Sequence, residues 1–176
     1  MRKSEHRTCA LFFCMEEFLN GKMPKQIEYG YKIDDDKIEQ PWECITDDRE
    51  FKGRIIGGCL DIISELSSTK YDGTKTFIEK YKNDGIIWYF DNCELSCDAT
   101  IRVLWKLKEL GYFKYTKAII FGRFGREESI YGYTTKTCLE DSVLSELNIP
   151  IIYDTDITHK SPCLTIINGS IVTISV

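Results

Sequence analysis

Short apolar runs alternate with amphipathic segments along most of this 176-residue chain. Three of the runs are rich in β-branched and aromatic residues, which is typical of strands that are buried on both faces. They are GIIWYF (85–90), KAIIFGRF (117–124) and IPIIYDTD (149–156). A shorter run of the same kind, GRIIGG (53–58), predicts one further strand.

Segments with helical periodicity separate these runs. The clearest is CDATIRVLWKLKELG (97–111), which ends at Gly111. Its predicted apolar stripe consists of Ile101, Leu104, Trp105 and Leu107. Three more helices are predicted at 59–68, 72–84 and 135–147. Because strands alternate with helices, the sequence predicts an α/β layered domain.

The two ends of the chain follow this alternation less closely. Residues 5–20 have the periodicity of an amphipathic helix, and residues 25–33 alternate like a strand. The acidic segment 34–53 contains a proline and has no sustained period, so we interpret it as a linker and a domain boundary. The last stretch, CLTIINGSIVTISV (163–176), predicts a terminal hairpin that turns at Asn168-Gly169.

Composition and charge exclude several classes of protein. The formal net charge of −5 argues against a nucleic-acid partner, which usually needs a basic face. No apolar run reaches the roughly 18 residues of a membrane span. The apolar run at 9–15 is followed at once by Glu16 and Glu17 and has no small-residue cleavage site, so we do not interpret it as a signal peptide. We therefore expect a cytoplasmic protein of one domain with an appendage.

The eight cysteines are spread singly along the chain and form no Cys-x-x-Cys pair. This spacing argues against a zinc ribbon. In a chain without an export signal, we expect them to be reduced and mostly buried thiols.

Titratable side chains follow two of the predicted strands. The run GIIWYF leads into Asp91, and the run IPIIYDTD leads to His159. In open α/β sheets, ligands gather at the carboxyl ends of the strands. If both strands are central, Asp91 can orient His159 as a general base, as in a nucleophile–base–orienter triad. From spacing alone, an ordinary loop histidine stays an open alternative.

No nucleophile stands in an evident catalytic context. The chain has no Gly-x-Ser-x-Gly elbow. Cys93 and Cys97 follow Asp91 closely, which leaves a Cys–His hydrolase open, although neither begins an evident oxyanion-forming helix. The segment GRFGRE (122–127) has two glycines after a strand but lacks the full dinucleotide-binding fingerprint.

Five segments, in order, resemble the C-terminal domain of the LD-carboxypeptidase family of serine peptidases, which includes the microcin-C immunity peptidases. They are GRIIGGCLD, GIIWYFDNCELS, IRVLWKLKELGYF, AIIFGRF and IPIIYDTDITHKSPCLTIINGS. The resemblance covers residues 51–176 and implies a layered α/β domain of the swivelling β/β/α type. Residues 1–50 then correspond to the end of the N-terminal half, as a helix, a strand and a linker.

The resemblance also implies a site. In this family an N-terminal domain supplies a serine, and the C-terminal domain supplies a glutamate and a histidine. The family cleaves the amide between an L- and a D-amino acid in murein tetrapeptides, or related peptide and acyl-nucleotide bonds, and needs no metal or cofactor. The histidine falls on His159 and the glutamate on Asp91. The substrate-contacting Gly-Gly motif falls on Gly57 and Gly58, and Cys59 stands where the family often has asparagine.

Two departures from the family pattern shape the expected function. Asp91 is one methylene shorter than glutamate, so we expect it to reach His159 only if the backbone lies closer or a water intervenes. No segment before residue 51 is long enough to hold the serine domain. We therefore expect a chain that is inactive alone, is completed by a nucleophile domain in cis or trans, and forms a homodimer as the resemblance implies. The alternative is a non-catalytic module that binds peptides or complements a partner domain.

Overall fold

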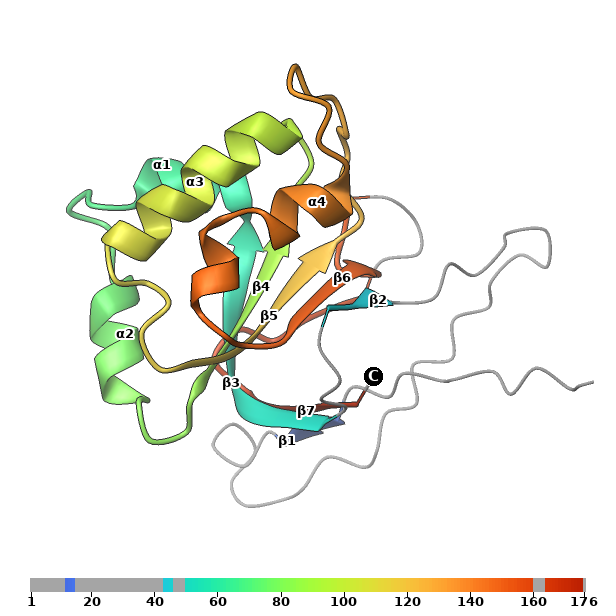
Figure 1. Cartoon of the computed structure of the whole chain (residues 1–176). Helices are drawn as coiled ribbons and strands as arrows, with labels where there is room; N and C mark the ends of the chain where they lie inside the picture. Colours follow the sequence, from blue (N-terminus) through green and yellow to red (C-terminus); the bar gives the residue numbers. More distant parts are fainter. Residues whose placement is uncertain (1–11, 15–42, 46–49, 160–163, 176) are drawn as a thin grey trace, which may run out of the picture.

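The computed structural model describes residues 12–14, 43–45, 50–159 and 164–175. Within this part of the chain, seven strands form one mixed sheet in the order β1-β7-β3-β4-β5-β6-β2 (Figure 1). The strands are β1 (Phe12–Cys14), β2 (Glu43–Cys44), β3 (Glu50–Cys59), β4 (Ile86–Asp91), β5 (Thr116–Gly122), β6 (Ile151–Thr155) and β7 (Ile171–Ser175). Strands β3 to β6 are parallel, and β1, β7 and β2 add antiparallel pairs at the two edges.

The helices lie together on one side of the parallel strands (Figure 1). They are α1 (Leu60–Leu66), α2 (Thr74–Lys80), α3 (Cys97–Glu109), α4 (Thr135–Glu140) and the 3-10 helix Val143–Glu146. Helix α3 lies centrally and contacts α1, α4 and the 3-10 helix. No helix in the described part of the chain has both the length and the apolar character needed to cross a membrane.

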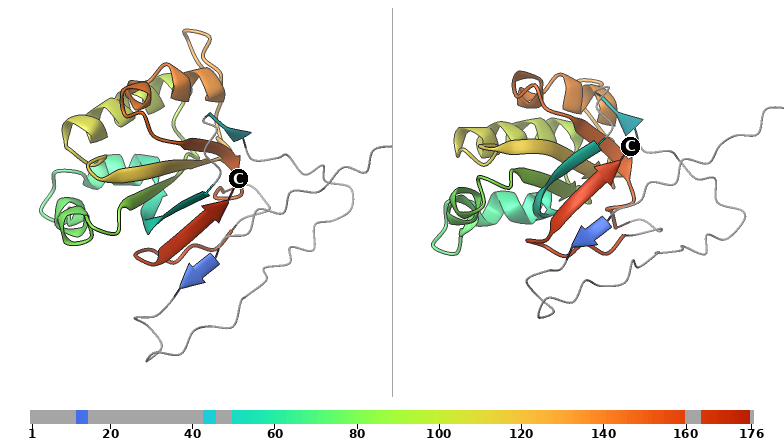
Figure 2. Two further views of the ribbon diagram at one scale, coloured as in Figure 1. Left: turned by 60° about the horizontal axis from the view of Figure 1, so that its bottom comes forward. Right: turned by 90° about the horizontal axis from the view of Figure 1, so that it is seen from below.

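Two apolar cores lie on opposite faces of the sheet, and β4 contributes to both. Ile86, Trp88 and Phe90 pack against the helices, whereas Ile87 belongs to the core on the other face. The second core is enclosed because β3 continues past the parallel strands and pairs with β7, so that the sheet curls (Figure 2). Burial on both faces explains why the central strands are continuous apolar runs, and the predicted α/β layering is confirmed.

Strand β3 is longer than the predicted segment 53–58. Its second half, from Arg54, pairs with β4, and its first half, from Glu50 to Arg54, pairs antiparallel with β7. The segment interpreted as a linker therefore contains both β2 and the start of β3.

Two further expectations about the chain ends differ from the structure. A helix was expected over 5–20, but residues 12–14, the described part of that range, form β1 and pair with β7. A terminal hairpin was expected over 163–176, but β7 pairs with β3 and β1, and residues 164–170 form no strand. The turn at Asn168-Gly169 is present, and it leads into a strand whose partners are distant in sequence. The strand expected at 25–33 lies outside the described residues.

The apolar stripe of α3 is also narrower than predicted. Leu104 and Leu107 are fully buried, but Trp105 is 57% exposed. Residue 105 lies about 100° around the helix from residue 104, which places it beyond the buried face. Gly111 has a φ of +79° just after the helix, as its predicted role in ending the helix requires.

Candidate active site at the carboxyl ends of the strands

Cys59 and Asp91 are neighbours at one end of the sheet. Each is the last residue of its strand, β3 and β4 respectively, and the parallel register pairs them directly. Cys59 also precedes the first turn of α1. Since the carboxyl ends of parallel strands meet at one edge, their two side chains emerge at the same place.

His159 reaches this edge from the segment that follows β6, although β5 lies between β6 and β4. Two contacts to the end of β5 hold the segment. The Thr158 hydroxyl donates to the Arg123 carbonyl oxygen at 2.9 Å, and Arg123 Nη2 lies 2.6 Å from Asp156 Oδ1. Gly122 permits the close approach, because a Cβ there would lie 1.7 Å from the carbonyl oxygen of Ile157.

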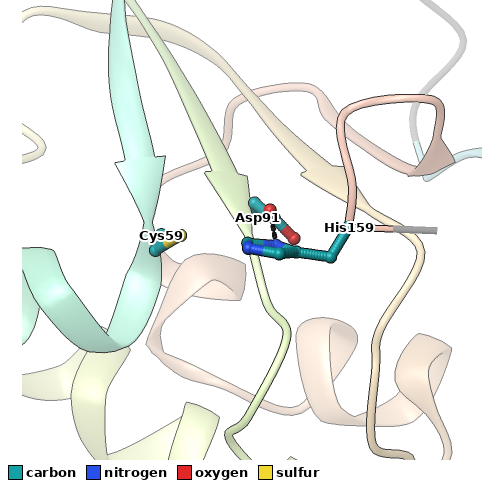
Figure 3. A group of neighbouring side chains, drawn as sticks. All are labelled: Cys59, Asp91 and His159. Atoms are coloured by element: carbon teal, nitrogen blue, oxygen red, sulfur yellow. Dashed lines mark ion pairs between the residues drawn. The ribbon is translucent and has the colours of Figure 1, made fainter. Parts of the chain in front are cut away.

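His159 and Asp91 form a direct ion pair between Nδ1 and Oδ2 (Figure 3). Although aspartate is one methylene shorter than the glutamate of the family pattern, its carboxylate contacts the imidazole directly, with no bridging group. The side chain of Asp91 is only 14% exposed, whereas that of His159 is 55% exposed. Burial raises the pKa of Asp91 above its ordinary value, and the contact with His159 opposes part of that rise.

The second carboxylate oxygen of Asp91 is in a different situation. Oδ1 is buried and has no hydrogen-bond partner among the described residues. A buried charged oxygen without a partner is costly in free energy. Asp91 Oδ1 is therefore free to bind a cation or to accept a hydrogen bond.

Cys59 lies on the far side of the imidazole from the backbone of His159, and the second ring nitrogen points toward it (Figure 3). One ligating atom each from Cys59, Asp91 and His159 lies within 4.8 Å of the other two. Burial raises the pKa of the Cys59 thiol, and the nearby carboxylates of Asp91 and Asp61 raise it further. The thiol is therefore held in its protonated form near neutral pH.

The two glycines before Cys59 line the same edge of the sheet. Gly57 cannot carry a side chain, because a Cβ would lie 1.8 Å from the carbonyl oxygen of Tyr89 on β4. Its backbone exchanges two hydrogen bonds with the Asn168 side chain: Gly57 N donates to Oδ1 at 3.0 Å, and Nδ2 donates to Gly57 O at 3.1 Å. Asn168 thus extends the hydrogen bonding of β3 beside Gly58 and Cys59, and only its Asn-Gly turn was visible in the sequence.

Other candidate groups of the sequence take different positions. Cys97 is buried at the start of α3, and burial raises the pKa of its thiol. Cys93 is partly buried on the turn after β4. The thiol that the structure brings to the Asp91–His159 pair is that of Cys59, for which the family resemblance implies a substrate contact and not a nucleophile or a metal ligand.

A hollow on the described surface lies away from Cys59, Asp91 and His159. It has a volume of about 430 Å³ and lies between α4, β2 and β6. Its lining residues are Glu43, Glu127, Thr134, Thr135, Lys136, Tyr153 and Asp154. None of the three residues drawn in Figure 3 lines it. The paired side chains, and not this hollow, define the candidate site, because they alone combine a base and an orienting carboxylate.

A protein-family model, that of the LD-carboxypeptidase C-terminal domain, matches residues 52–174 of the chain. No curated protein sequence is significantly similar to the chain.

Solved structures share the fold at low sequence identity. The microcin C7 self-immunity protein MccF, solved with aspartyl sulfamoyl adenosine, has 20% identity and a TM-score of 0.59, covering 80% of this chain and 44% of that one. A muramoyltetrapeptide carboxypeptidase from Oxalobacter formigenes has 21% identity and a TM-score of 0.54, covering 78% and 51%. An MccF-like protein from Streptococcus pneumoniae, solved with AMP, has 21% identity and a TM-score of 0.56, covering 76% and 41%. The chain thus spans about half the length of these proteins.

Proposed function

Since the chain belongs to the LD-carboxypeptidase C-terminal domain family, whose model it matches over residues 52–174, we propose that it provides the histidine and the carboxylate of a serine-peptidase active site. The observation that carries this proposal is the direct ion pair between His159 and Asp91 at the carboxyl ends of the strands.

In the proposed mechanism His159 is the general base. Its Nδ1 is bound to Asp91, so the second ring nitrogen is the atom that accepts the proton of a serine hydroxyl and later returns it to the leaving amine. The imidazole is half exposed, which leaves this nitrogen accessible to a group from outside the described residues.

Asp91 is the orienting residue. Its carboxylate accepts a hydrogen bond from Nδ1–H, which selects the tautomer with a free lone pair on the other nitrogen. The carboxylate also stabilises the imidazolium formed during proton transfer. The partial burial of Asp91 strengthens this effect, because a charge pair interacts more strongly away from water.

The serine comes from an N-terminal domain, either covalently joined or supplied as a separate chain. The proposed substrates are murein tetrapeptides or related peptide amides between an L- and a D-amino acid. Gly57, Gly58 and Cys59 are the proposed substrate contacts, since they border the ion pair at the end of β3. Residues 1–176 alone then carry a base and its orienter without their nucleophile and are inactive.

The test is a complementation assay with an N-terminal serine domain of the same family, supplied as a separate chain. We expect neither part alone to release the terminal D-amino acid from a murein tetrapeptide, and we expect the mixture to do so. The variant His159→Ala should lower the rate of the mixture by about 10³-fold or more. The matched control is His6→Ala, which alters the other histidine of the chain.

Two results would contradict the proposal. One is hydrolysis by the 176-residue chain alone that serine-directed reagents abolish. The other is a mixture whose rate does not change in His159→Ala. A mixture that binds the tetrapeptide tightly but never cleaves it would favour the non-catalytic binding module instead.

A further inference from the structure

Cys59, Asp91 and His159 together offer a chemistry that a serine peptidase does not use. They supply a thiol sulfur, a carboxylate oxygen and an imidazole nitrogen. Within the described ranges, this is the one group of three such side chains that lie close enough to hold a metal ion. Sulfur, nitrogen and oxygen are the three ligand types that Zn²⁺ takes from proteins.

The separations come close to those of a four-coordinate ion once the direct contact between His159 and Asp91 opens to admit it. Ligands at about 2.0–2.3 Å from a tetrahedral Zn²⁺ lie roughly 3.5 Å from one another. The three ligating atoms here lie within 4.8 Å of one another. Because the His159 side chain is 55% exposed, it can rotate away from Asp91 and toward Cys59 without disturbing the core.

The charges around the thiol favour a cation. Its charged neighbours are acidic: they are Asp91, Asp61 and Glu94. Negative surroundings attract a divalent cation, which stabilises the thiolate that it coordinates. The same surroundings disfavour Cys59 as a free nucleophile, which needs electropositive neighbours.

The unpartnered oxygen of Asp91 is an independent observation. Oδ2 is engaged with His159, but the buried Oδ1 has no partner among the residues that the structure describes. The carboxylate thus keeps one oxygen that can bind a cation when the side chain turns toward it. Three protein ligands also leave a fourth position open, as in zinc sites that exchange a solvent molecule.

We propose that Cys59, Asp91 and His159 bind a thiophilic divalent cation such as Zn²⁺, with the fourth position taken by solvent. Binding transfers the Cys59 thiol proton to solvent and forms a metal–thiolate bond. The ion is then coordinated by the imidazole of His159, which can no longer act as a base. That consequence rests on the proposed function: Zn²⁺ inhibits the complemented peptidase, and removal of Zn²⁺ restores it.

The test uses Co²⁺ as a spectroscopic substitute for Zn²⁺ on the reduced, metal-free 176-residue chain. We expect a thiolate-to-cobalt charge-transfer absorption that saturates at one equivalent and disappears when Zn²⁺ displaces Co²⁺. Cys59→Ser and Cys59→Ala should both abolish this absorption. His159→Ala and Asp91→Ala should weaken Co²⁺ binding by about 10- to 100-fold or more. Cys44→Ser is the matched control, because it removes a partly buried thiol on β2, which three strands separate from β3, and should bind as the wild type does.

Three outcomes would overturn the proposal. The absorption can fail to appear, or it can persist in both Cys59 variants, which would place the thiolate ligands among the other cysteines. Alternatively, iodoacetamide can alkylate Cys59 of the metal-free chain rapidly at neutral pH in a way that His159→Ala abolishes, which would identify a Cys–His nucleophile. None of these readouts uses peptidase activity, so failure of complementation and failure of metal binding are separate results.

Discussion

Arg123 and Asp156 form an ion pair of 2.6 Å between the end of β5 and the segment that follows β6. Both side chains are largely buried, with exposed fractions of 14% and 24%. The pair therefore fixes the start of the segment that ends at His159, and it indirectly sets where the imidazole meets Asp91. We therefore expect Arg123 to act as a positioning residue, through its contacts with Asp156 and Thr158.

Arg123→Met should lower both the stability of the chain and the rate of the complemented peptidase. Removing one partner of a partly buried pair should cost about 1–3 kcal/mol in the free energy of unfolding. Misplacement of the base by a fraction of an ångström should lower kcat by about tenfold or more. The measurements are urea unfolding and the pH–rate profile, which should change shape if the orientation of His159 is altered.

Arg126→Met is the matched control for this prediction, because Arg126 forms an exposed ion pair with Glu128 on the following loop. We expect it to leave stability and rate unchanged. Arg123→Lys should recover part of the rate. An unchanged pH–rate profile in Arg123→Met, with stability alone reduced, would assign Arg123 a purely structural role.

Asp91→Asn should lower kcat of the complemented peptidase by about 10³- to 10⁴-fold while leaving the fold intact. An amide in this position favours the wrong imidazole tautomer, so the nitrogen that should accept the serine proton already carries one. Asp91→Glu should stay within about tenfold of wild type, since glutamate is the residue of the family pattern. Steady-state kinetics measure both, and Glu94→Gln on the adjacent turn is the control. Equal rates for Asp91→Asn and wild type would eliminate the orienting role.

Gly57→Ala should destabilise the chain strongly. Its Cβ would lie 1.8 Å from the carbonyl oxygen of Tyr89, so β3 and β4 must separate where they carry Cys59 and Asp91. We expect a loss of about 3 kcal/mol or more, measured by urea unfolding. Gly73→Ala is the control, because nothing lies within 4 Å of a Cβ there. Comparable unfolding midpoints for the two variants would show that the strands can absorb the extra methyl group.

A pH-dependent contribution to stability is expected from Asp72 and Tyr112, whose carboxylate and hydroxyl meet at 2.5 Å. Burial opposes ionisation of Asp72, but hydrogen bonds from the Tyr112 hydroxyl and two backbone N–H groups outweigh it and lower its pKa from 3.8 to about 2. Burial, and then the contact with Asp72, raises the pKa of Tyr112 to about 12.

The direction of the pH dependence of stability follows from the lowered pKa of Asp72. Its contribution is fully present above the ordinary aspartate pKa of 3.8 and is lost as the pH falls toward 2. Asp72→Asn should therefore cost about 1 kcal/mol at pH 7, allowing for solvent screening, and the difference from wild type should shrink below pH 3.8. Urea unfolding at several pH values measures this. Asp141→Asn, at an exposed position, should show no such trend. A difference that stays constant down to pH 2 would contradict the assignment.

The pattern of apolar and polar residues is enough to predict the layered α/β fold and the two strand ends that bear the candidate chemistry. The apolar run of β4 is long enough to require burial on both faces, and α3 has a clear amphipathic period. Parallel strands share the edge at which they end, so strand direction alone predicts that Asp91 and His159 lie at the same edge of the sheet. These inferences succeed because periodicity and strand direction are local properties of the chain.

Which segments pair with one another follows from the three-dimensional packing and not from the local pattern. A period of two identifies the faces of β7 but not its neighbours, so a local hairpin was predicted where β7 pairs with β3 and β1. The contact of Asn168 with Gly57, 111 residues apart, and the approach of Cys59 to His159 are likewise invisible in the sequence. They depend on strand order and register, which arise from packing between residues far apart along the chain. The sequence thus located the candidate base and its orienter, and the three-dimensional arrangement brought the cysteine beside them.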